Sequence, residues 1–228
     1  MTVHASRIEA ASNVQALPRS ASPRSRGFYS SYLKRTVDLG LVFMALPFLM
    51  PFMLVLSALI FAQDGKSPLF RQERIGRDGR RFRIWKFRTM VADAEAQLER
   101  HLESDPTARA EWNAKQKLSV DPRVTPIGRI LRRSSVDELP QLLNVLAGEM
   151  SLVGPRPMMP SQQALYSGNG YYRLRPGLTG NWQVSARNES SFADRANFDD
   201  SYAQSVSFLG DARIVAQTVG VVLRGTGV

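Results

Sequence analysis

The sequence predicts an α+β fold, in which a mostly helical, membrane-resting domain contains a small β-hairpin and is anchored by one kinked, re-entrant N-terminal helix. Two observations lead to this prediction. Residues 39–62 form a run of 24 uncharged, mostly apolar residues, and residues 68–75 and 81–88 alternate in polarity around Asp78-Gly79. A chain of 228 residues has room for one ordinary core, because domains usually hold roughly 100–200 residues. We therefore expect one folded domain behind the apolar helix.

The composition narrows the kinds of partner and excludes several kinds of site. There is no cysteine, so disulfides, thiolate metal sites and redox chemistry on sulfur are excluded. The two histidines, His4 and His101, are too few and too isolated for a histidine-based metal site. The formal net charge of +10 indicates anionic partners, namely nucleic acid, lipid headgroups or phosphorylated small molecules. The sequence contains no motif that reads nucleic acid, so we expect no nucleic-acid partner.

Residues 1–31 are predicted to be a disordered basic tail. They are rich in Ser, Ala and Arg and lack the continuous apolar stretch of a secretory signal peptide. An amphipathic targeting helix is the alternative, but Pro18 and Pro23 interrupt any helix there.

Residues 32–63 are predicted to enter the membrane and to return on the same side. A helix over residues 39–62 would be about 36 Å long, enough to cross a hydrocarbon core of roughly 30 Å. However, Pro47 and Pro51 each remove a backbone donor and clash with the preceding turn, so we expect a bend near the middle. Positive charge on both sides favours both ends remaining cytoplasmic. The flanking cations are Lys34, Arg35, Lys66, Arg71 and Arg74.

Residues 64–228 are predicted to form the cytoplasmic domain. In the second strand of the hairpin, apolar residues mix with cations, so one face can pack while the other carries positive charge. Pro and Gly are dense in residues 154–180, which predicts loops that help to build a site. The other predicted elements are a surface helix at 91–104, a short basic segment at 125–133, a helix at 136–146 that stops at Gly148, and a final helix at 212–223.

Two adjacent carboxylates, Asp137 and Glu138, are the strongest candidates for chemistry. Ser135-x-x-Glu138 has the pattern of a capping box, in which serine and glutamate satisfy the free backbone donors of a helix start. A carboxylate at a helix N-terminus is also kept ionised by the helix dipole, as a nucleophile or a Mg²⁺ ligand must be. The structural and the catalytic interpretations are compatible.

Arginines near the acidic pair predict that the site binds phosphate. Arg156 lies between Pro155 and Pro157, which restrict the backbone on both sides, so its guanidinium is presented at low entropic cost. Bidentate phosphate binding benefits from a guanidinium fixed in this way. Arg132 is either a second phosphate ligand or a solvated surface charge. Arg175 is also followed by a proline, in Arg175-Pro176-Gly177, and is a weaker candidate for phosphate binding because no proline precedes it.

Six motifs occur in order along the chain. They are Lys34-Arg35-x-x-Asp38, Gln72-Glu73-Arg74-x-Gly76, Lys86-Phe87-Arg88-Thr89-Met90, Asp137-Glu138-Leu139-Pro140-Gln141, Ser151-Leu152-Val153-Gly154-Pro155-Arg156-Pro157 and Arg175-Pro176-Gly177-Leu178-Thr179-Gly180. With them the chain, from about residue 34 to its C-terminus, resembles the bacterial sugar transferases, or monotopic phosphoglycosyl transferases. That family transfers a sugar phosphate from a nucleotide sugar to a polyprenyl phosphate. The short length and single hydrophobic segment are similar to those of its small exopolysaccharide-initiating members.

The resemblance implies a covalent mechanism in two steps. Asp137 would attack the sugar-bearing phosphorus of a UDP-sugar, UMP would leave, and the polyprenyl phosphate would then take the phosphosugar from the enzyme. Glu138 would help to hold Mg²⁺, the expected cofactor. The residues expected to bind phosphate or substrate are Lys86, Arg88, Arg132, Pro155, Arg156, Pro157 and Arg175.

The resemblance also implies the partners and the location. The expected partners are a UDP-sugar, best UDP-galactose or UDP-glucose, polyprenyl phosphate and the lipid of the bacterial inner membrane, with the domain on its cytoplasmic face. A homodimer is a further expectation, because the domain carries an apolar face. The chain departs from its relatives at Met50-Pro51, where some have Ser-Pro, and at Ser185-Ala186-Arg187, where glycine is often central.

Other interpretations of the sequence remain open. A non-catalytic, membrane-associated basic binding protein would explain the charge and the apolar run but gives no role to Arg156 or to the acidic pair. A metal-dependent glycosyltransferase that acts directly on lipid would release UDP rather than UMP. For residues 39–62, the alternatives are a kinked helix that spans the membrane and the buried hairpin of a soluble protein.

Overall fold

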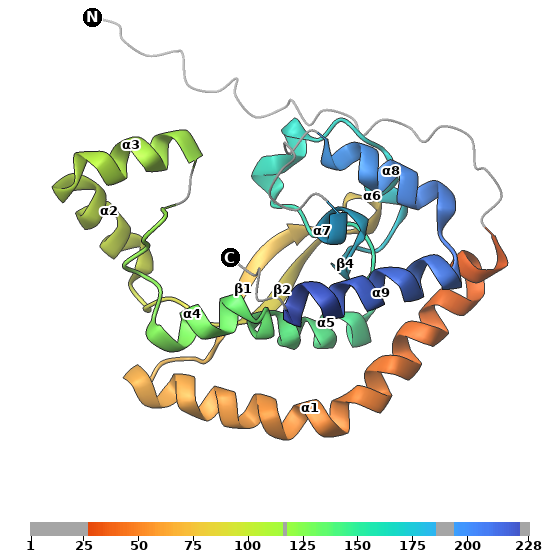
Figure 1. Ribbon diagram of the computed structural model, residues 1–228, viewed down its shortest axis with the longest axis horizontal. Coiled ribbons are helices and arrows are strands. Elements are labelled where there is room, and N and C mark those ends of the chain that lie inside the picture. Colours follow the sequence, from red (N-terminus) through yellow and green to blue (C-terminus); the bar gives the residue numbers. More distant parts are fainter. Residues whose placement is uncertain (1–26, 116–117, 186–193, 224–228) are drawn as a thin grey trace, which may run out of the picture.

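The structure, a computed structural model, describes residues 27–115, 118–185 and 194–223. Most of the predicted tail, residues 1–31, lies outside these ranges. Helices dominate, and two small two-stranded sheets lie among them (Figure 1). The predicted α+β class is confirmed.

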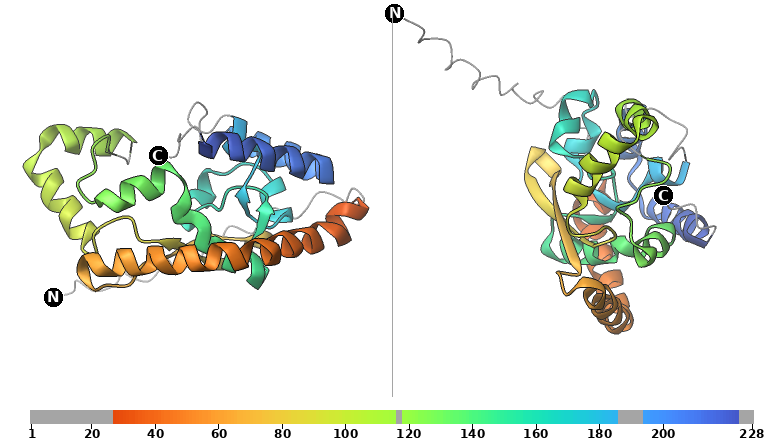
Figure 2. Two further views of the ribbon diagram at one scale, coloured as in Figure 1. Left: turned by 60° about the horizontal axis from the view of Figure 1, so that its bottom comes forward. Right: turned by 90° about the vertical axis from the view of Figure 1, so that its left-hand side faces the viewer.

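The helices gather around the hairpin, and α2 and α3 extend from one end as an arm (Figure 1, Figure 2). The predicted helix at 91–104 corresponds to α2, the basic segment to α4 and the final helix to α9. The bounds are α2 (Ala94–Ser104), α3 (Pro106–Lys115), α4 (Pro126–Arg133), α5 (Leu142–Ala147), α6 (Gly170–Arg173), α7 (Asn181–Ser185), α8 (Arg195–Ser205) and α9 (Phe208–Leu223).

The N-terminal helix α1 (Lys34–Asp64) continues through Pro47 and Pro51 and follows a π-helix at Tyr29–Leu33. It bends near its middle (Figure 1), where the prolines remove backbone donors and crowd the preceding turns. Tyr29–Asp64 is long and apolar enough to cross a membrane, by length and composition. Its re-entrance stays a prediction.

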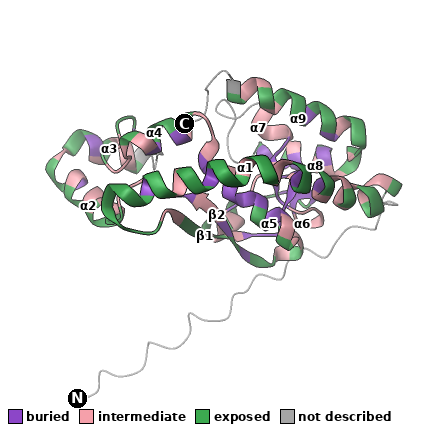
Figure 3. Cartoon of the chain, turned by 90° about the horizontal axis from the view of Figure 1, so that it is seen from below, coloured by how far each residue is buried: buried purple, intermediate pink, exposed green. Residues whose placement is uncertain are grey.

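One side of α1 packs on the domain and the other side is exposed. Val42 and Ile60 are each 1% exposed, and Met53 is also buried. Figure 3 shows α1 lying along the outside of the domain with a mostly exposed surface. A long apolar face of this kind marks a surface that meets lipid or protein. Its exposed large residues are Leu41, Phe43, Met44, Phe48, Met50, Phe52, Leu54, Val55, Leu59 and Phe61.

Polar contacts attach the start of α1 to three distant parts of the domain. Lys34 Nζ lies 2.5 Å from Asp211 Oδ2 in α9. Arg35 donates hydrogen bonds to two carbonyl oxygens at the C-terminal end of α5, where the helix dipole favours a cation. Asp38 is buried and accepts a hydrogen bond from the Ser151 hydroxyl at 2.6 Å. These contacts fix the position of the start of α1 on the domain.

Strands β1 (Leu69–Ile75) and β2 (Arg81–Phe87) pair antiparallel, which confirms the predicted hairpin. Asp78 and Gly79 in the turn have φ values of 58° and 75°, a left-handed conformation that Asp and Gly tolerate well. Alternate side chains of β2, beginning with Phe82, pack inward. The main core forms where β2, α5 and α1 meet.

Residues 154–180 contain short ordered elements where the sequence predicts loops. They include a 3₁₀-helix at Pro160–Leu165, α6 and β4 (Gly177–Thr179), which pairs parallel with β3 (Ser151–Val153). A three-residue strand is too short to produce a periodic pattern, so the Pro and Gly content decides the prediction in this region.

Candidate active site

A cleft of about 780 Å³ lies between the ends of the hairpin strands, the start of α2 and the segment that carries the acidic pair. Asp137 and Glu138 both line it. Four of the predicted phosphate-binding residues line it as well, namely Lys86 at the end of β2, Arg88 just after it, Arg132 from α4 and Arg156 from the loop after β3. The fold thus gathers groups that are widely separated in the sequence.

The acidic pair lies in a 3₁₀-helix, Val136–Gln141, that runs directly into α5. The residue before it, Ser135, has φ 56° and makes no capping hydrogen bond with its side chain. The predicted helix at 136–146 is therefore two short helices, and the serine half of the capping box is absent. A non-glycine residue at positive φ stores strain, which is typical of functional sites.

Lys86 is the closest cation to the acidic pair. It shares the inward side of β2 with Phe82, because every second side chain of a strand points the same way. Its Nζ lies 2.7 Å from Glu138 Oε1 and 3.9 Å from Asp137 Oδ2. Nη2 of Arg156 lies 3.4 Å from the same oxygen of Glu138. The cluster therefore holds two carboxylates and two cations within a few ångströms.

Burial raises the pKa of Asp137 above the ordinary value of an aspartate. Lys86 is the strongest influence in the opposite direction, and Glu138 adds to the rise, whereas Arg132 and Arg156 lower the pKa. The ionised form is thus poorly solvated but surrounded by positive charge. A carboxylate in such surroundings is suited to act as a nucleophile.

Backbone contacts on both sides hold Arg156 at the cleft. The amide of Gly154 donates to Thr179 O at 2.9 Å, and the amide of Gly177 donates to Pro155 O at 2.8 Å. On the other side, Arg74 donates to Pro157 O at 3.3 Å. Pro155 and Pro157 contribute backbone oxygens and rigidity, while the side chain between them faces the cleft. The backbone is therefore held on both sides of Arg156, so little conformational freedom is left to lose when the guanidinium binds a ligand.

Two of the predicted substrate-binding arginines have other contacts. Arg88 lines the cleft, but its guanidinium bonds to both carboxylate oxygens of Asp64, at 2.5 and 2.6 Å, and so joins the end of α1 to the cleft. Arg175 lines a different pocket and donates to Gly148 O at 2.9 Å. The structure does not bring Arg175 to the acidic pair.

Among the lining residues that the sequence-based prediction does not name, three have side chains in hydrogen bonds or ion pairs near the cleft. Thr89 accepts a hydrogen bond from Arg132 Nε at 2.9 Å and so orients that arginine. Gln72 accepts one from a neighbouring arginine of β1. Arg123 is paired with Asp121 at 2.7 Å. Gln72 and Thr89 belong to two of the six motifs, so the sequence could have identified them as site residues. Arg123 lies in no motif, and only its charge distinguishes it.

An apolar groove of about 540 Å³ adjoins the cleft. It runs between α1 and α9, and its polar end contains Ser135 and Glu138, which also line the cleft. Leu41 and Met44 on its wall belong to the exposed apolar face of α1, so the groove joins that face to the acidic pair.

Comparison with known proteins gives consistent matches. A "UDP-galactose-lipid carrier transferase" of Erwinia amylovora is 46% identical over 200 residues, which is 87% of this chain and 42% of that protein. The "exopolysaccharide production protein ExoY" of Sinorhizobium fredii is 44% identical over 196 residues, 85% of this chain and 87% of that protein. An "undecaprenyl-phosphate galactose phosphotransferase" of Salmonella typhimurium is 42% identical over 87% of this chain and 42% of its own length.

The chain therefore spans less than half of two of these relatives and most of the third. The profile described as "bacterial sugar transferase" matches residues 29–225, which covers nearly all of the chain. This match and the identities above show that the chain belongs to the bacterial sugar transferase family.

Proposed function

We propose that the chain transfers a hexose-1-phosphate from a UDP-sugar, best UDP-galactose or UDP-glucose, to polyprenyl phosphate and releases UMP. The observation that carries this proposal is the cluster of Asp137, Glu138, Lys86 and Arg156 in a cleft that joins an apolar groove. The names of the relatives include a lipid carrier, undecaprenyl phosphate, galactose and exopolysaccharide production. The reaction is the first step in building such a glycan.

The reaction proceeds by two displacements at one phosphorus. A carboxylate oxygen of Asp137 attacks the phosphorus that carries the sugar, and the bond to the bridging oxygen breaks, so UMP leaves with that oxygen. A phosphate oxygen of the acceptor then attacks the same phosphorus. The bond to Asp137 breaks, which regenerates the carboxylate and yields a sugar diphosphate on the polyprenyl chain.

Neutralisation of charge makes the first attack possible, because a carboxylate and a diphosphate repel each other. Lys86, Arg132 and Arg156 surround the acidic pair and provide that charge. The pair also fits Mg²⁺, which proteins commonly hold through one or two carboxylates plus substrate phosphates. Glu138 would help to hold the ion, and the ion would polarise the phosphoryl oxygens when bound.

The acceptor reaches the same phosphorus from the membrane side in this proposal. The isoprenoid chain lies in the groove between α1 and α9, whose apolar wall continues the exposed face of α1. Its phosphate then meets Glu138 at the polar end of the groove. In this proposal the water-soluble donor and the lipid acceptor meet from opposite sides of one cluster, at the cytoplasmic face of the inner membrane.

The identity of the nucleotide product tests the proposed reaction. The full chain, incubated with Mg²⁺, polyprenyl phosphate and a panel of UDP-sugars, should release UMP, with UDP-galactose or UDP-glucose the best donor. Chromatography of the nucleotides separates UMP from UDP. Release of UDP would establish a direct glycosyltransferase, and no release with any donor would favour a binding protein.

The topology of α1 is tested by placing single cysteines at Ser31 and Lys66, which is straightforward because the chain has no cysteine. If α1 is re-entrant, both cysteines should resist an impermeant thiol reagent applied outside intact cells and react after lysis. Labelling of one of the two in intact cells would show that the helix spans the membrane.

When the pH is lowered, activity is expected to fall at a higher pH than it would if the nucleophile were an aspartate with an ordinary pKa. Burial raises the pKa of Asp137, and the nucleophile must be ionised. Lys86→Met should move this acidic limb further upward, because Lys86 opposes the rise most strongly. The measurement is kcat/KM for the UDP-sugar against pH. A Lys86→Met profile that is lower but unshifted would show that Lys86 does not act on the ionisation of Asp137.

A further inference from the structure

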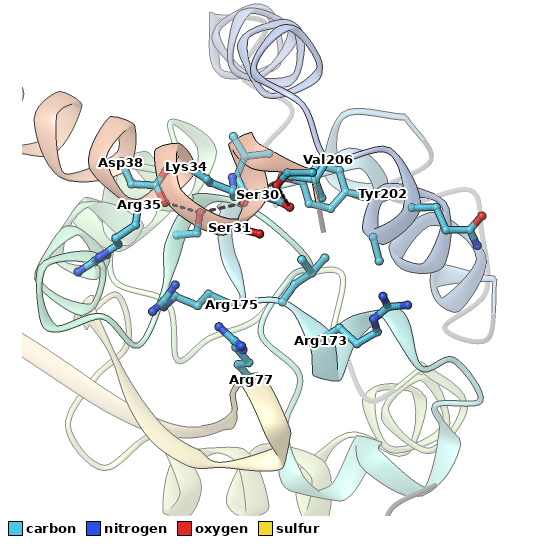
Figure 4. Close-up of a pocket in the computed structure, with 16 residues that line it drawn as sticks. Ser30, Ser31, Lys34, Arg35, Asp38, Arg77, Arg173, Arg175, Tyr202 and Val206 are labelled. Atoms are coloured by element: carbon cyan, nitrogen blue, oxygen red, sulfur yellow. Dashed lines mark hydrogen bonds between the residues drawn. The ribbon is translucent and has the colours of Figure 1, made fainter. Parts of the chain in front are cut away.

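A second pocket, of about 390 Å³, lies beside the start of α1. It is enclosed by that end of α1, the turn between β1 and β2, and the segments around α6 and α8 (Figure 4). None of the residues that line it also lines the cleft of the acidic pair. It is therefore separate from the proposed site of phosphosugar transfer.

The pocket has a strong excess of positive charge. Five of its lining side chains are cationic, and one, Asp38, is a carboxylate. The carboxylate oxygens of Asp38 already accept hydrogen bonds from Ser151 and from the amide of Leu152. The cations are Lys34, Arg35, Arg77, Arg173 and Arg175.

Three of these guanidiniums retain free donors. Within residues 27–115, 118–185 and 194–223, the side chain of Arg173 makes no hydrogen bond or ion pair, and the side chain of Arg175 donates only through its Nε. Arg77 is in contact with the adjacent Asp78 alone, at 3.4 Å between Nε and Oδ2. An arginine has five N–H donors in a planar fork, so most of the donors of this group remain available to a ligand.

We propose that this pocket binds a phosphoryl group between Arg77 and Arg175, with Arg173 across the cavity as a further cation. Figure 4 shows Arg77 extending toward Arg175, whereas Arg173 lies apart from these two and extends the other way. The guanidinium fork matches the spacing of phosphate oxygens and favours two-pronged contacts. Burial lowers the pKa of Arg175, and the charges of Arg35 and Arg77 lower it further. Asp38 offsets part of this repulsion, and a bound anion would offset more of it.

The headgroup of an anionic phospholipid and a phosphate-bearing small molecule from solution both present such a group. Lys34 and Arg35 lie four or five residues before the apolar run at 39–62, about 6–8 Å along a helix axis, so the pocket is within reach of the lipid headgroups. The cleft adjoins the other end of α1 through the ion pair of Arg88 and Asp64. A headgroup in the pocket would fasten the domain to the membrane at the end of α1 opposite the cleft.

The test compares the parent protein with an Arg77→Gln/Arg173→Gln variant in detergent. One probe is phosphatidylglycerol, measured as bound lipid by native mass spectrometry with phosphatidylcholine as reference. The other probe is inorganic phosphate, measured by thermal stabilisation. The variant should bind at least one probe about tenfold more weakly, equivalent to ~1.4 kcal/mol. It should still fold, because Arg77 and Arg173 are both partly exposed.

Arg80→Gln is the control for loss of charge in the turn of Arg77, since it removes one positive charge there at an exposed residue that does not line the pocket. It should leave both affinities unchanged. A loss confined to phosphatidylglycerol identifies a lipid headgroup, and a loss confined to phosphate identifies a soluble ligand. Equal weakening by Arg80→Gln, unchanged binding by the double variant, or no binding of either probe to the parent would overturn the proposal. The readouts need no turnover, so they are independent of the proposed reaction.

Discussion

Asp137→Asn is expected to abolish both the release of UMP and the formation of a modified enzyme. Given UDP-sugar and Mg²⁺ without lipid acceptor, the parent protein should release at most one UMP per active site and become heavier by one sugar phosphate. Asparagine has nearly the same shape as aspartate but is a far weaker nucleophile, so turnover should fall by at least about 10³-fold. Intact-protein mass spectrometry and nucleotide analysis measure the two signals.

Asp105→Asn is the matched control for a purely structural role. Asp105 caps α3, where its Oδ1 accepts hydrogen bonds from the amides of Thr107 and Ala108. Asparagine is about as good a cap as aspartate, so this variant should keep normal turnover and stability. If Asp137→Asn behaved in the same way, or if turnover needed donor and acceptor together with no modified enzyme, the covalent mechanism would be wrong.

The elements with a clear periodic pattern are predictable from the sequence. The alternation around Asp78-Gly79 gives the hairpin, and the apolar run gives α1 with its bend at Pro47 and Pro51. The gathering of Lys86, Arg156 and the acidic pair agrees with the phosphate site that the motifs predict. The local pattern suffices for the hairpin and for α1, because the contacts that define these elements repeat along the chain.

Features that depend on contacts between distant segments could not be predicted from the sequence. Arg88 lies two residues after Lys86 and has the same charge, yet its partner Asp64 comes from the end of α1, which no local pattern reveals. The left-handed backbone of Ser135 is likewise imposed by the fold, because the residue type does not favour it. Arg175 is directed away from the acidic pair by its bond to Gly148. In each case the tertiary structure decides between alternatives that the sequence leaves open.

Gly177→Ala is expected to destabilise the domain and to reduce turnover together, because β3 and β4 approach each other too closely for a side chain. A Cβ at this position would lie 2.1 Å from Gly154 N and 2.3 Å from Thr179 O, both backbone atoms that are held in hydrogen bonds. Overpacking against a rigid backbone should cost about 3 kcal/mol or more. For a domain of this size that is a fall in Tm of roughly 6–12 °C in detergent.

Gly220→Ala in α9 is the matched control for Gly177→Ala, since nothing lies within 4 Å of a Cβ at Gly220. Replacing a helical glycine by alanine should stabilise the protein by about 0.5–1 kcal/mol, so the two variants should change the Tm in opposite directions. The loss of turnover in Gly177→Ala should exceed what its folded fraction explains, because Gly154 leads directly into the segment that presents Arg156. A Tm within about 2 °C of the parent, less than 1 kcal/mol by the same scaling, would show that this strand contact does not hold the phosphate-binding loop in place.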